Sequence, residues 1–486
     1  MNFSKRALWL VTFLFFLLPT SCFALGYEQE PNDTIETATY IDLNTPFQGE
    51  KTYSSKMDYY KFTLPADGKV NVSIKNKVGS TWFVTVMDGK QKTYQYFASN
   101  SGVEVVDNNI DKTSVDLGLP AGTYYLLVNC DDQTLKVPYE IEVDFKKTDY
   151  YEKEFNDSME NATPILINKK YNGLIESEDC WSCAPSQDYF KFKIPADGNV
   201  TLTVKNKVGA NWYFSVQDVK GKQIQYLPTL SGVEVEDNKL TYKKVNIGLP
   251  KGTYYILITG SDSSVDIPYQ FEVDFKKSSY YEKEFNDSME TANKIKTNRT
   301  YNGTIEYHSS CWSCSSALDY YKFSVPQTGH VDLSLAKKKG HHWSGTLLNG
   351  KGEYIYHFDS NTGKKTIRLP KGTYYIQIVS GEGSATVPYK LIASYKVLWG
   401  KVLVEKSQVG KITAKSNVEQ YQLSKSGKLT KKRTLSKGTE VNVYGTKRIK
   451  GTTYYKVGGS YYVKKSSRVN YKKIPSSISK IIKTYY

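Results

Sequence analysis

One acidic stretch opens three parts of this chain: Tyr27-Glu28-Gln29-Glu30-Pro31-Asn32-Asp33, Tyr151-Glu152-Lys153-Glu154-Phe155-Asn156-Asp157 and Tyr281-Glu282-Lys283-Glu284-Phe285-Asn286-Asp287. Each copy is followed by the same two landmarks in the same order. The first is an Asp-Tyr-Tyr/Phe-Lys-Phe segment at 58–62, 188–192 and 319–323, and the second is Leu-Pro-x-Gly-Thr-Tyr-Tyr at 119–125, 249–255 and 369–375. Internal self-similarity indicates a repeated structural unit. The sequence therefore predicts three modules, at 26–149, 150–279 and 280–395.

Within a module the apolar residues alternate with polar ones. Val70, Val72 and Ile74 follow the period of two that a β-strand gives. The stretch 124–128 is more apolar, so we expect that strand to be buried on both faces. The segment 65–68 has the proline and glycine of a turn between strands. Many short strands predict an all-β fold of tandem, jelly-roll-like β-sandwiches, and no stretch after the first 24 residues shows a long helical period.

Residues 1–24 have the composition of a secretion signal peptide. Basic residues precede an apolar run at 7–18, and Ala24 stands at a small-residue cleavage point. The run is too short to span a bilayer, and we expect no transmembrane segment later in the chain. Lipidation of Cys22 is an alternative, although Pro19 fits such a site poorly. We therefore expect the chain to be exported.

Positive charge is concentrated in the C-terminal segment. Residues 396–486 contain 22 Lys and Arg against three Glu, a net of +19, whereas the whole chain has +16, so the rest carries about −3. A small domain with this charge is either a well-solvated basic tail or the binding site of an anionic partner. Outside the membrane, teichoic acid and peptidoglycan are such partners. Nucleic acid is not expected there, and no aromatic-interleaved RNA-binding signature is present.

The repeated landmarks resemble the bacterial pre-peptidase C-terminal domain, a β-sandwich appended to many secreted proteases. That family is related to the collagen-binding domain of clostridial collagenases. The resemblance covers all three modules and implies calcium binding through the acidic segment and a later aspartate. A catalytic domain usually precedes the module in that family, and we recognise none before the modules of this chain.

The acidic opening predicts that at least one of the three modules binds Ca²⁺. Alternating side chains let several carboxylate and amide oxygens converge, and Ca²⁺ takes six to eight oxygens. Carried over by position from the resemblance, the implied ligands are Glu28, Glu30, Asn32, Asp33 and Asp58; Glu152, Glu154, Asn156, Asp157 and Asp188; and Glu282, Glu284, Asn286, Asp287 and Asp319. The alternative is that the Asn-Asp pair merely caps a turn.

Cysteines form two Cys-Trp-Ser-Cys pairs, Cys180 with Cys183 and Cys311 with Cys314. In an exported chain we expect a local disulfide in each pair. A four-thiolate zinc site or redox-active thiols are the alternatives, but the pairs lie in different modules. Cys130 has no neighbour in the sequence to pair with.

No pattern of a known catalytic site is present. The sequence has no His-Glu-x-x-His, no Gly-x-Ser-x-Gly and no phosphate-binding glycine loop. The tightly clustered acids suit a cation better than the spaced pair of a glycosidase. All five histidines fall in the third module, and the adjacent His341 and His342 would point to opposite faces of a strand. We therefore expect that the chain is not an enzyme.

Short strands separated by glycine turns are expected in the basic segment, at 439–444, 453–457 and 460–464. The stretch 438–469 resembles bacterial SH3-like domains and the related repeats that tether surface-layer proteins to Gram-positive walls. The resemblance implies that 396–486 is a small SH3-like β-barrel that binds the cell wall.

Together these features predict a secreted, non-catalytic binding or scaffold protein on the wall of a Gram-positive bacterium, with calcium-stabilised sandwiches and a basic wall-binding domain. Two alternatives stay open. One is an adhesin that binds collagen or another extracellular polymer. The other is an accessory component of a secreted protease, or an unrecognised hydrolase.

Overall fold

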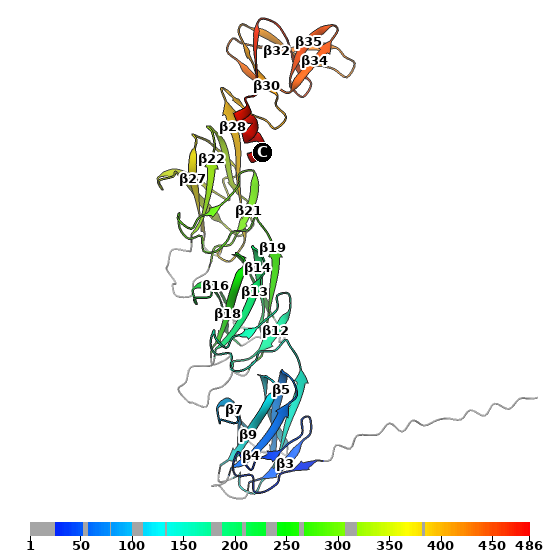
Figure 1. Cartoon of the computed structure of the whole chain (residues 1–486), viewed down its shortest axis with the longest axis vertical. Coiled ribbons are helices and arrows are strands. Elements are labelled where there is room, and N and C mark those ends of the chain that lie inside the picture. Colours follow the sequence, from blue (N-terminus) through cyan, green and yellow to red (C-terminus); the bar gives the residue numbers. More distant parts are fainter. Residues whose placement is uncertain are drawn as a thin grey trace, which may run out of the picture. The chain divides into compact units, whose positions relative to one another are not determined.

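The computed structural model describes residues 25–51, 57–77, 79–99, 110–131, 134–175, 187–206, 210–229, 241–261, 267–306, 318–381 and 384–486. The predictions for the secretion signal at 1–24, for Cys22 and for Cys180, Cys183, Cys311 and Cys314 lie outside these residues, as does His308. Strands make up most of the described chain (Figure 1). The prediction of an all-β fold built from β-sandwiches is confirmed.

The first module is a sandwich of two sheets with the strand orders β1-β3-β10-β5-β8 and β2-β4-β9-β6-β7. The first sheet contains β1 (Gly26–Tyr27), β3 (Phe47–Glu50), β10 (Pro138–Lys147), β5 (Gly68–Lys77) and β8 (Ile110–Leu119). The second contains β2 (Thr39–Tyr40), β4 (Asp58–Leu64), β9 (Gly122–Cys130), β6 (Trp82–Met87) and β7 (Thr93–Ser99). The short strand β1 pairs in parallel with β3, and the short strand β2 pairs in parallel with β4. All other neighbouring strands of this module pair antiparallel.

The second module repeats this arrangement with the orders β12-β19-β14-β17 and β11-β13-β18-β15-β16. The first sheet contains β12 (Lys170–Gly173), β19 (Tyr269–Lys277), β14 (Gly198–Asn206) and β17 (Thr241–Leu249). The second contains β11 (Thr163–Pro164), β13 (Asp188–Ile194), β18 (Gly252–Gly260), β15 (Trp212–Gln217) and β16 (Gln223–Pro228).

The third module has the orders β21-β28-β23-β26 and β20-β22-β27-β24-β25, and β29 pairs with the end of β28. The first sheet contains β21 (Arg299–Gly303), β28 (Tyr389–Trp399), β23 (Gly329–Leu335), β26 (Lys365–Leu369) and β29 (Val402–Leu403). The second contains β20 (Asn293–Lys294), β22 (Asp319–Val325), β27 (Gly372–Ser380), β24 (Trp343–Leu348) and β25 (Tyr354–Asp359).

Each sandwich core contains one fully buried tryptophan beside one buried tyrosine near the start of the last strand. The pairs are Trp82 with Tyr139, Trp212 with Tyr269 and Trp343 with Tyr389, with ring centroids 4.3, 6.2 and 6.4 Å apart. Val70, Val72 and Ile74 are fully buried, as their alternation predicts. The expectation that 124–128 is buried on both faces is wrong: Tyr125 and Leu127 of β9 are only half-buried, because a two-layer sandwich leaves the outer face of each sheet partly open.

The basic segment forms a smaller two-sheet domain with the orders β33-β30-β37 and β32-β31-β36-β35-β34. The first sheet contains β33 (Glu440–Val443), β30 (Gly410–Ala414) and β37 (Val469–Lys473). The second contains β32 (Leu429–Leu435), β31 (Val418–Leu423), β36 (Tyr461–Lys464), β35 (Thr452–Gly458) and β34 (Gly445–Ile449). A core centred on Ile412, Val443 and Val463 holds the two sheets together.

After the basic domain, the chain returns to the third module as α1 (Ser476–Tyr485). Ile478 is 2% exposed and belongs to the core of the third sandwich. The Tyr486 hydroxyl accepts a hydrogen bond from the Val397 amide (2.7 Å) and donates to the Val404 carbonyl (3.1 Å). The sequence analysis found no long helical period, yet Ile478, Ile481 and Ile482 have helical spacing in this ten-residue helix. The core of the third sandwich therefore includes residues on the C-terminal side of position 396.

Residues 410–473 accordingly form an insertion in the third module. The Ile474 amide donates to the Val409 carbonyl (3.1 Å), and Gly410 pairs with Lys473 in the sheet. The chain thus leaves and re-enters the third sandwich at adjacent residues. The Lys411 ammonium, 4% exposed, binds the Glu440 carboxylate (2.7 Å) and the Trp399 carbonyl (3.0 Å) at this junction.

Removing the side chain of Ile478 is expected to destabilise the third sandwich. Truncation of a buried isoleucine to alanine costs about 2–5 kcal/mol, so Ile478→Ala should speed hydrogen exchange in β22 and β27 of the full chain. Lys480→Ala, on the exposed side of the same helix, is the matched control and should leave exchange unchanged. Equal protection in both variants would show that α1 is not part of this folding unit.

Candidate functional sites

Four carboxylates are buried together in the third module. Glu282 and Glu284 come from the opening segment, Glu306 follows β21, and Asp319 is the first residue of β22. Oxygens of Glu282, Glu284 and Glu306 lie within 4.8 Å of one another, a spacing that could hold a metal ion. Asp319 joins them because the buried Tyr389 hydroxyl contacts both Asp319 Oδ2 and Glu282 Oε2, the latter at 3.1 Å.

Several oxygens of this acidic cluster lack a donor among the described residues. Neither carboxylate oxygen of Glu284, which is 8% exposed, accepts a hydrogen bond. The same holds for Asp319 Oδ1, for Glu306 Oε2 and for the side-chain amide of Asn286. A buried carboxylate without a donor or a counter-charge is costly, so the cluster requires protons or a cation. Oxygen-only ligands of this kind fit a hard cation such as Ca²⁺.

Burial shifts the acid equilibria of this cluster. Removal from water, followed by repulsion from the Glu306 carboxylate, raises the pKa of Glu282 to about 8. Burial likewise raises the pKa values of Glu284 and Asp319 well above the ordinary range, and the neighbouring carboxylates add to the rise. Without a cation, the folded third module therefore holds protons that the unfolded chain releases at the same pH.

The second module has a similar cluster. Oxygens of Glu152, Glu154 and Asp188 lie within 4.8 Å of one another, and all three residues are buried. The Tyr269 hydroxyl lies 2.8 Å from Glu152 Oε2 and 2.5 Å from Asp188 Oδ2. The Asn156 side-chain amide lies 3.2 Å from both Asp188 Oδ1 and Glu154 Oε1, and with its NH2 group turned toward them it can donate to both carboxylates.

The first module departs from this pattern. The Tyr139 hydroxyl donates to Asp58 Oδ2, and Tyr60 donates to Glu28 Oε2, both at 2.7 Å. Burial raises the pKa of Asp58 to about 6, but Glu30 is exposed, unlike Glu154 and Glu284. Among the described residues, no set of acids in this module converges closely enough to hold a metal ion.

Some predicted ligands lie outside the converging sets. Asp33 and Asp157 are half-buried and Asp287 is exposed, with its Oδ2 3.8 Å from the Lys222 ammonium of the second module. Glu306 was missed because the sequence comparison sought residues shared by all three modules. An available signal was the pair Ile305-Glu306, which has a counterpart in the second module but not in the first.

The opening segment of the third module also contacts the second module. The Glu284 amide donates to the Gly248 carbonyl (2.9 Å), and Lys283 forms an ion pair with Asp197. The Lys222 ammonium lies 3.4 Å from the centre of the Phe285 ring. The acidic cluster is therefore built from a segment that also joins two modules.

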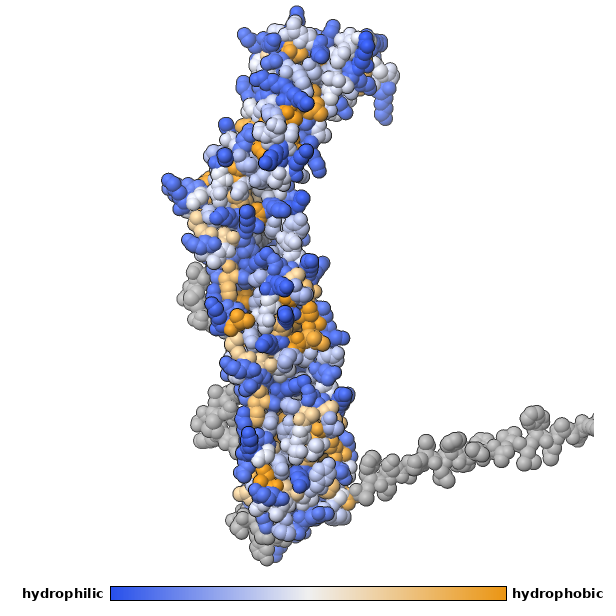
Figure 2. Space-filling view, viewed as in Figure 1, coloured by the Kyte–Doolittle hydropathy of each residue, from blue (hydrophilic) through white to orange (hydrophobic). Residues whose placement is uncertain are grey.

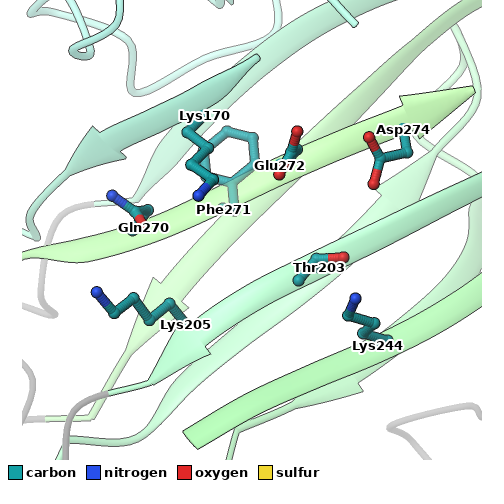
Figure 3. Close-up of a pocket in the computed structure, with 8 residues that line it drawn as sticks. All are labelled: Lys170, Thr203, Lys205, Lys244, Gln270, Phe271, Glu272 and Asp274. Carbon is teal, nitrogen blue, oxygen red and sulfur yellow. The ribbon is translucent and has the colours of Figure 1, made fainter. Parts of the chain in front are cut away.

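A hollow of about 400 Å³ lies on one sheet of the second module (Figure 3). Its lining side chains come from β12, β14, β17 and β19 and include Lys170, Lys205, Lys244 and Glu272. In the first module Lys75 pairs with Glu140 at 2.5 Å, whereas the equivalent partner of Lys205 is the neutral Gln270. Lys205 has no ion pair among the described residues, so this face can offer positive charge to a ligand.

The basic domain presents its charge to solvent. Within 410–473 every lysine and arginine except Lys411 is exposed, and Figure 2 shows hydrophilic side chains over the face of this domain in view. One groove, of about 480 Å³, contains Lys431, Lys464 and Arg468, and a second, of about 420 Å³, contains Lys432 and Arg433. Lys431 pairs with Glu419 (2.6 Å). Lys464 and Arg468 have no carboxylate partner in the described chain.

The remaining candidates form no site in the described residues. Cys130 is buried in the first core, and no acidic or metal-ligating set of the described chain includes a histidine. His342 lies 4.0 Å from Asp359. No helix in the described part is both long and apolar enough to cross a membrane.

The third module should lose stability as pH rises when no divalent cation is available. Glu282 has a folded pKa of about 8 against an ordinary 4.5, so the folded state binds more protons and stability falls between these pH values. Protection factors of amides in β22 and β27, which divide out the base-catalysed intrinsic exchange rate, should be higher at pH 5 than at pH 8 in chelator. Glu282→Gln should flatten this dependence, and the exposed Glu290→Gln should retain it. Lower protection factors at pH 5 than at pH 8 in the parent chain would contradict the assignment.

Comparisons with known proteins match two parts of the chain. Residues 410–466 match the surface layer protein A domain family, SlpA. The collagenase ColT of Clostridium tetani (strain Massachusetts / E88) is 27% identical over 249 residues, which are 48% of this chain and 23% of the collagenase. The chain therefore spans less than a quarter of that relative.

Two solved structures show similarity to parts of the chain. The pre-peptidase C-terminal domain of a collagenase from Bacillus anthracis is 23% identical and covers 22% of this chain and 94% of its own, with a TM-score of 0.18. The tandem CBM51 modules of a family 98 glycoside hydrolase from Streptococcus pneumoniae are 9% identical and cover 48% of this chain and 85% of their own, with a TM-score of 0.16. The chain is thus similar to a surface-layer domain in its basic part and to a collagenase segment over about half its length.

Proposed function

We propose that this chain is a secreted, non-catalytic surface protein that attaches to the anionic wall polymer of a Gram-positive bacterium through residues 410–473. The observation that carries the proposal is the insertion itself. Its limits nearly coincide with the match to the surface layer protein A domain at 410–466, and its basic side chains other than Lys411 are exposed. We infer that this domain is SH3-like and that the three sandwiches are modules of the pre-peptidase C-terminal type.

Electrostatics supports an anionic polymer as the partner. Exposed lysines and arginines on a small domain attract a polyanion from a distance and bind its charges along a groove. Lys464 and Arg468 line such a groove without a carboxylate partner in the described chain. Teichoic acid carries repeated phosphate charges, and peptidoglycan carries carboxylates.

Calcium is the cofactor that the acidic clusters fit. Glu282, Glu284, Glu306 and Asp319 would hold it in the third module, and Glu152, Glu154 and Asp188 in the second. A bound Ca²⁺ would neutralise carboxylates whose burial is otherwise uncompensated. Because the Glu284 backbone also bonds to Gly248, ordering this segment would stiffen the joint between the second and third modules.

An adhesin for collagen or another extracellular polymer is the second candidate. The 27% identity to a segment of a collagenase and the lysine-lined hollow of the second module favour it. In that case the sandwiches, rather than residues 410–473, would carry the main binding activity.

Ca²⁺ should stabilise the second and third modules. A ligand that binds only the folded state adds about 2.7 kcal/mol at 100 times its Kd, so melting in Ca²⁺ should occur several degrees above melting in chelator. Glu284→Gln should reduce this gain, and Glu290→Gln, exposed and outside the converging acids, should preserve it. Identical melting curves of the parent chain in Ca²⁺ and in chelator would refute calcium binding.

Wall binding should depend on residues 410–473 and on salt. A variant that joins Val409 to Ile474 through two glycines keeps α1 and the third core, because these residues are already hydrogen bonded. It should no longer sediment with purified walls. Binding of the full chain should fall between 0.05 and 0.5 M NaCl, since charge pairs are screened over about 10 Å at 0.1 M salt.

Two point variants refine that experiment. Lys464→Glu with Arg468→Glu should weaken wall binding, whereas Lys480→Glu on the exposed side of α1 should change it little. Removing teichoic acid from the walls should act as salt does. If the variant lacking 410–473 still binds walls fully, the proposal is refuted. If that variant binds immobilised collagen, the result favours the adhesin.

A further inference from the structure

The first module contains a buried lysine at the place where the other two modules have isoleucine. Lys51 is 1% exposed, and Ile175 and Ile305 are both fully buried. The hydrogen bond made by the preceding residue shows that Lys51, Ile175 and Ile305 occupy equivalent positions. The amides of Glu50, Leu174 and Thr304 donate to Oε1 of the opening glutamate of their own module, at 2.6 Å in the first and 2.8 Å in the second.

We propose that Lys51 is the resident cation of the first module and replaces the divalent ion there, so that the chain binds two Ca²⁺ ions rather than three. The inference rests on the proposed calcium function of the other modules. It separates the three repeats into one module that is independent of calcium and two that require it.

The surroundings of Lys51 are adapted to a charged side chain. Its ammonium donates a hydrogen bond to Asn129 Oδ1. Asn129 lies on β9 at the position that Thr259 and Val379 occupy in the second and third modules, as their pairing with the neighbouring strand shows. The lysine and its amide partner thus occur together in the module that lacks a converging set of acids among the described residues.

The carboxylates nearby complete the argument. A lysine is almost never fully buried unless it is paired. Asp58 of the same module is 2% exposed, and the charge of the buried Lys51 ammonium attracts its carboxylate. Glu30 is exposed, and therefore the first module buries fewer carboxylates than the third. One ammonium can therefore neutralise the buried carboxylate charge of the first module. The third module needs a doubly charged ion, because it buries four carboxylates: Glu282, Glu284, Glu306 and Asp319.

Native mass spectrometry of the full chain, loaded with Ca²⁺ after chelation, counts the bound ions. The parent chain should bind two. Lys51→Ile with Thr52→Glu, which copies the Ile305-Glu306 pair of the third module, should bind one ion more, and Ile305→Lys should bind one fewer. The exposed Lys90→Ile in the first module is the matched control and should keep the parent number.

Three ions on the parent chain would overturn the role of Lys51 and leave the calcium proposal intact, whereas no ion at all would overturn both. Hydrogen exchange of the parent chain gives a readout that needs no variant. Protection of β4 and β9 should be the same in Ca²⁺ and in chelator, and protection of β13, β18, β22 and β27 should rise with Ca²⁺. Calcium-dependent protection of β4 and β9 would refute the inference.

Discussion

A buried contact between a tyrosine hydroxyl and an aspartate connects the core of each sandwich to its acidic site. Tyr139, Tyr269 and Tyr389 pack beside the central tryptophan and direct their hydroxyl groups at Asp58, Asp188 and Asp319. The aspartate begins the strand that also supplies core residues, so it cannot move to water without disturbing the sandwich. Its burial is therefore fixed by the fold, and the resulting charge must be neutralised within the protein.

The modules meet this requirement with different neighbours. In the first, the buried Lys51 ammonium donates to Asn129 and attracts the aspartate by its charge. In the third, further carboxylates gather instead, which raises the electrostatic cost until a cation or protons reduce it. The opening segment of the third module also bonds to Gly248 of the second. Charge neutralisation in one core is thus linked to the joint with its neighbour through a single run of backbone.

The sequence predicted what the repeats share and missed what distinguishes them. The opening glutamate and the later aspartate recur in every copy, and in the second and third modules they contact the same tyrosine hydroxyl. Asp33, Asp157 and Asp287 recur equally but stand outside the converging sets. Recurrence alone cannot tell which alternate side chain faces inward, because that depends on how the segment enters the sandwich. Lys51 and Glu306 were missed because they differ between modules. Helix α1 was missed because ten residues give a weak periodic signal, and its isoleucines are recognisable only beside the third core.

The insertion of the basic domain follows from packing rather than charge. A boundary drawn from composition falls at 396, where lysines become frequent, but core packing continues through Val404 and resumes at Ile478. Between them, β30 and β37 pair with each other, and Lys411 binds Glu440 and the Trp399 carbonyl. A domain held by two adjacent strands and a buried ion pair has less freedom than one on a single linker, because both crossing points must open before it can swing away. A load on the basic domain would therefore reach the third sandwich through its own core strand β28 and helix α1.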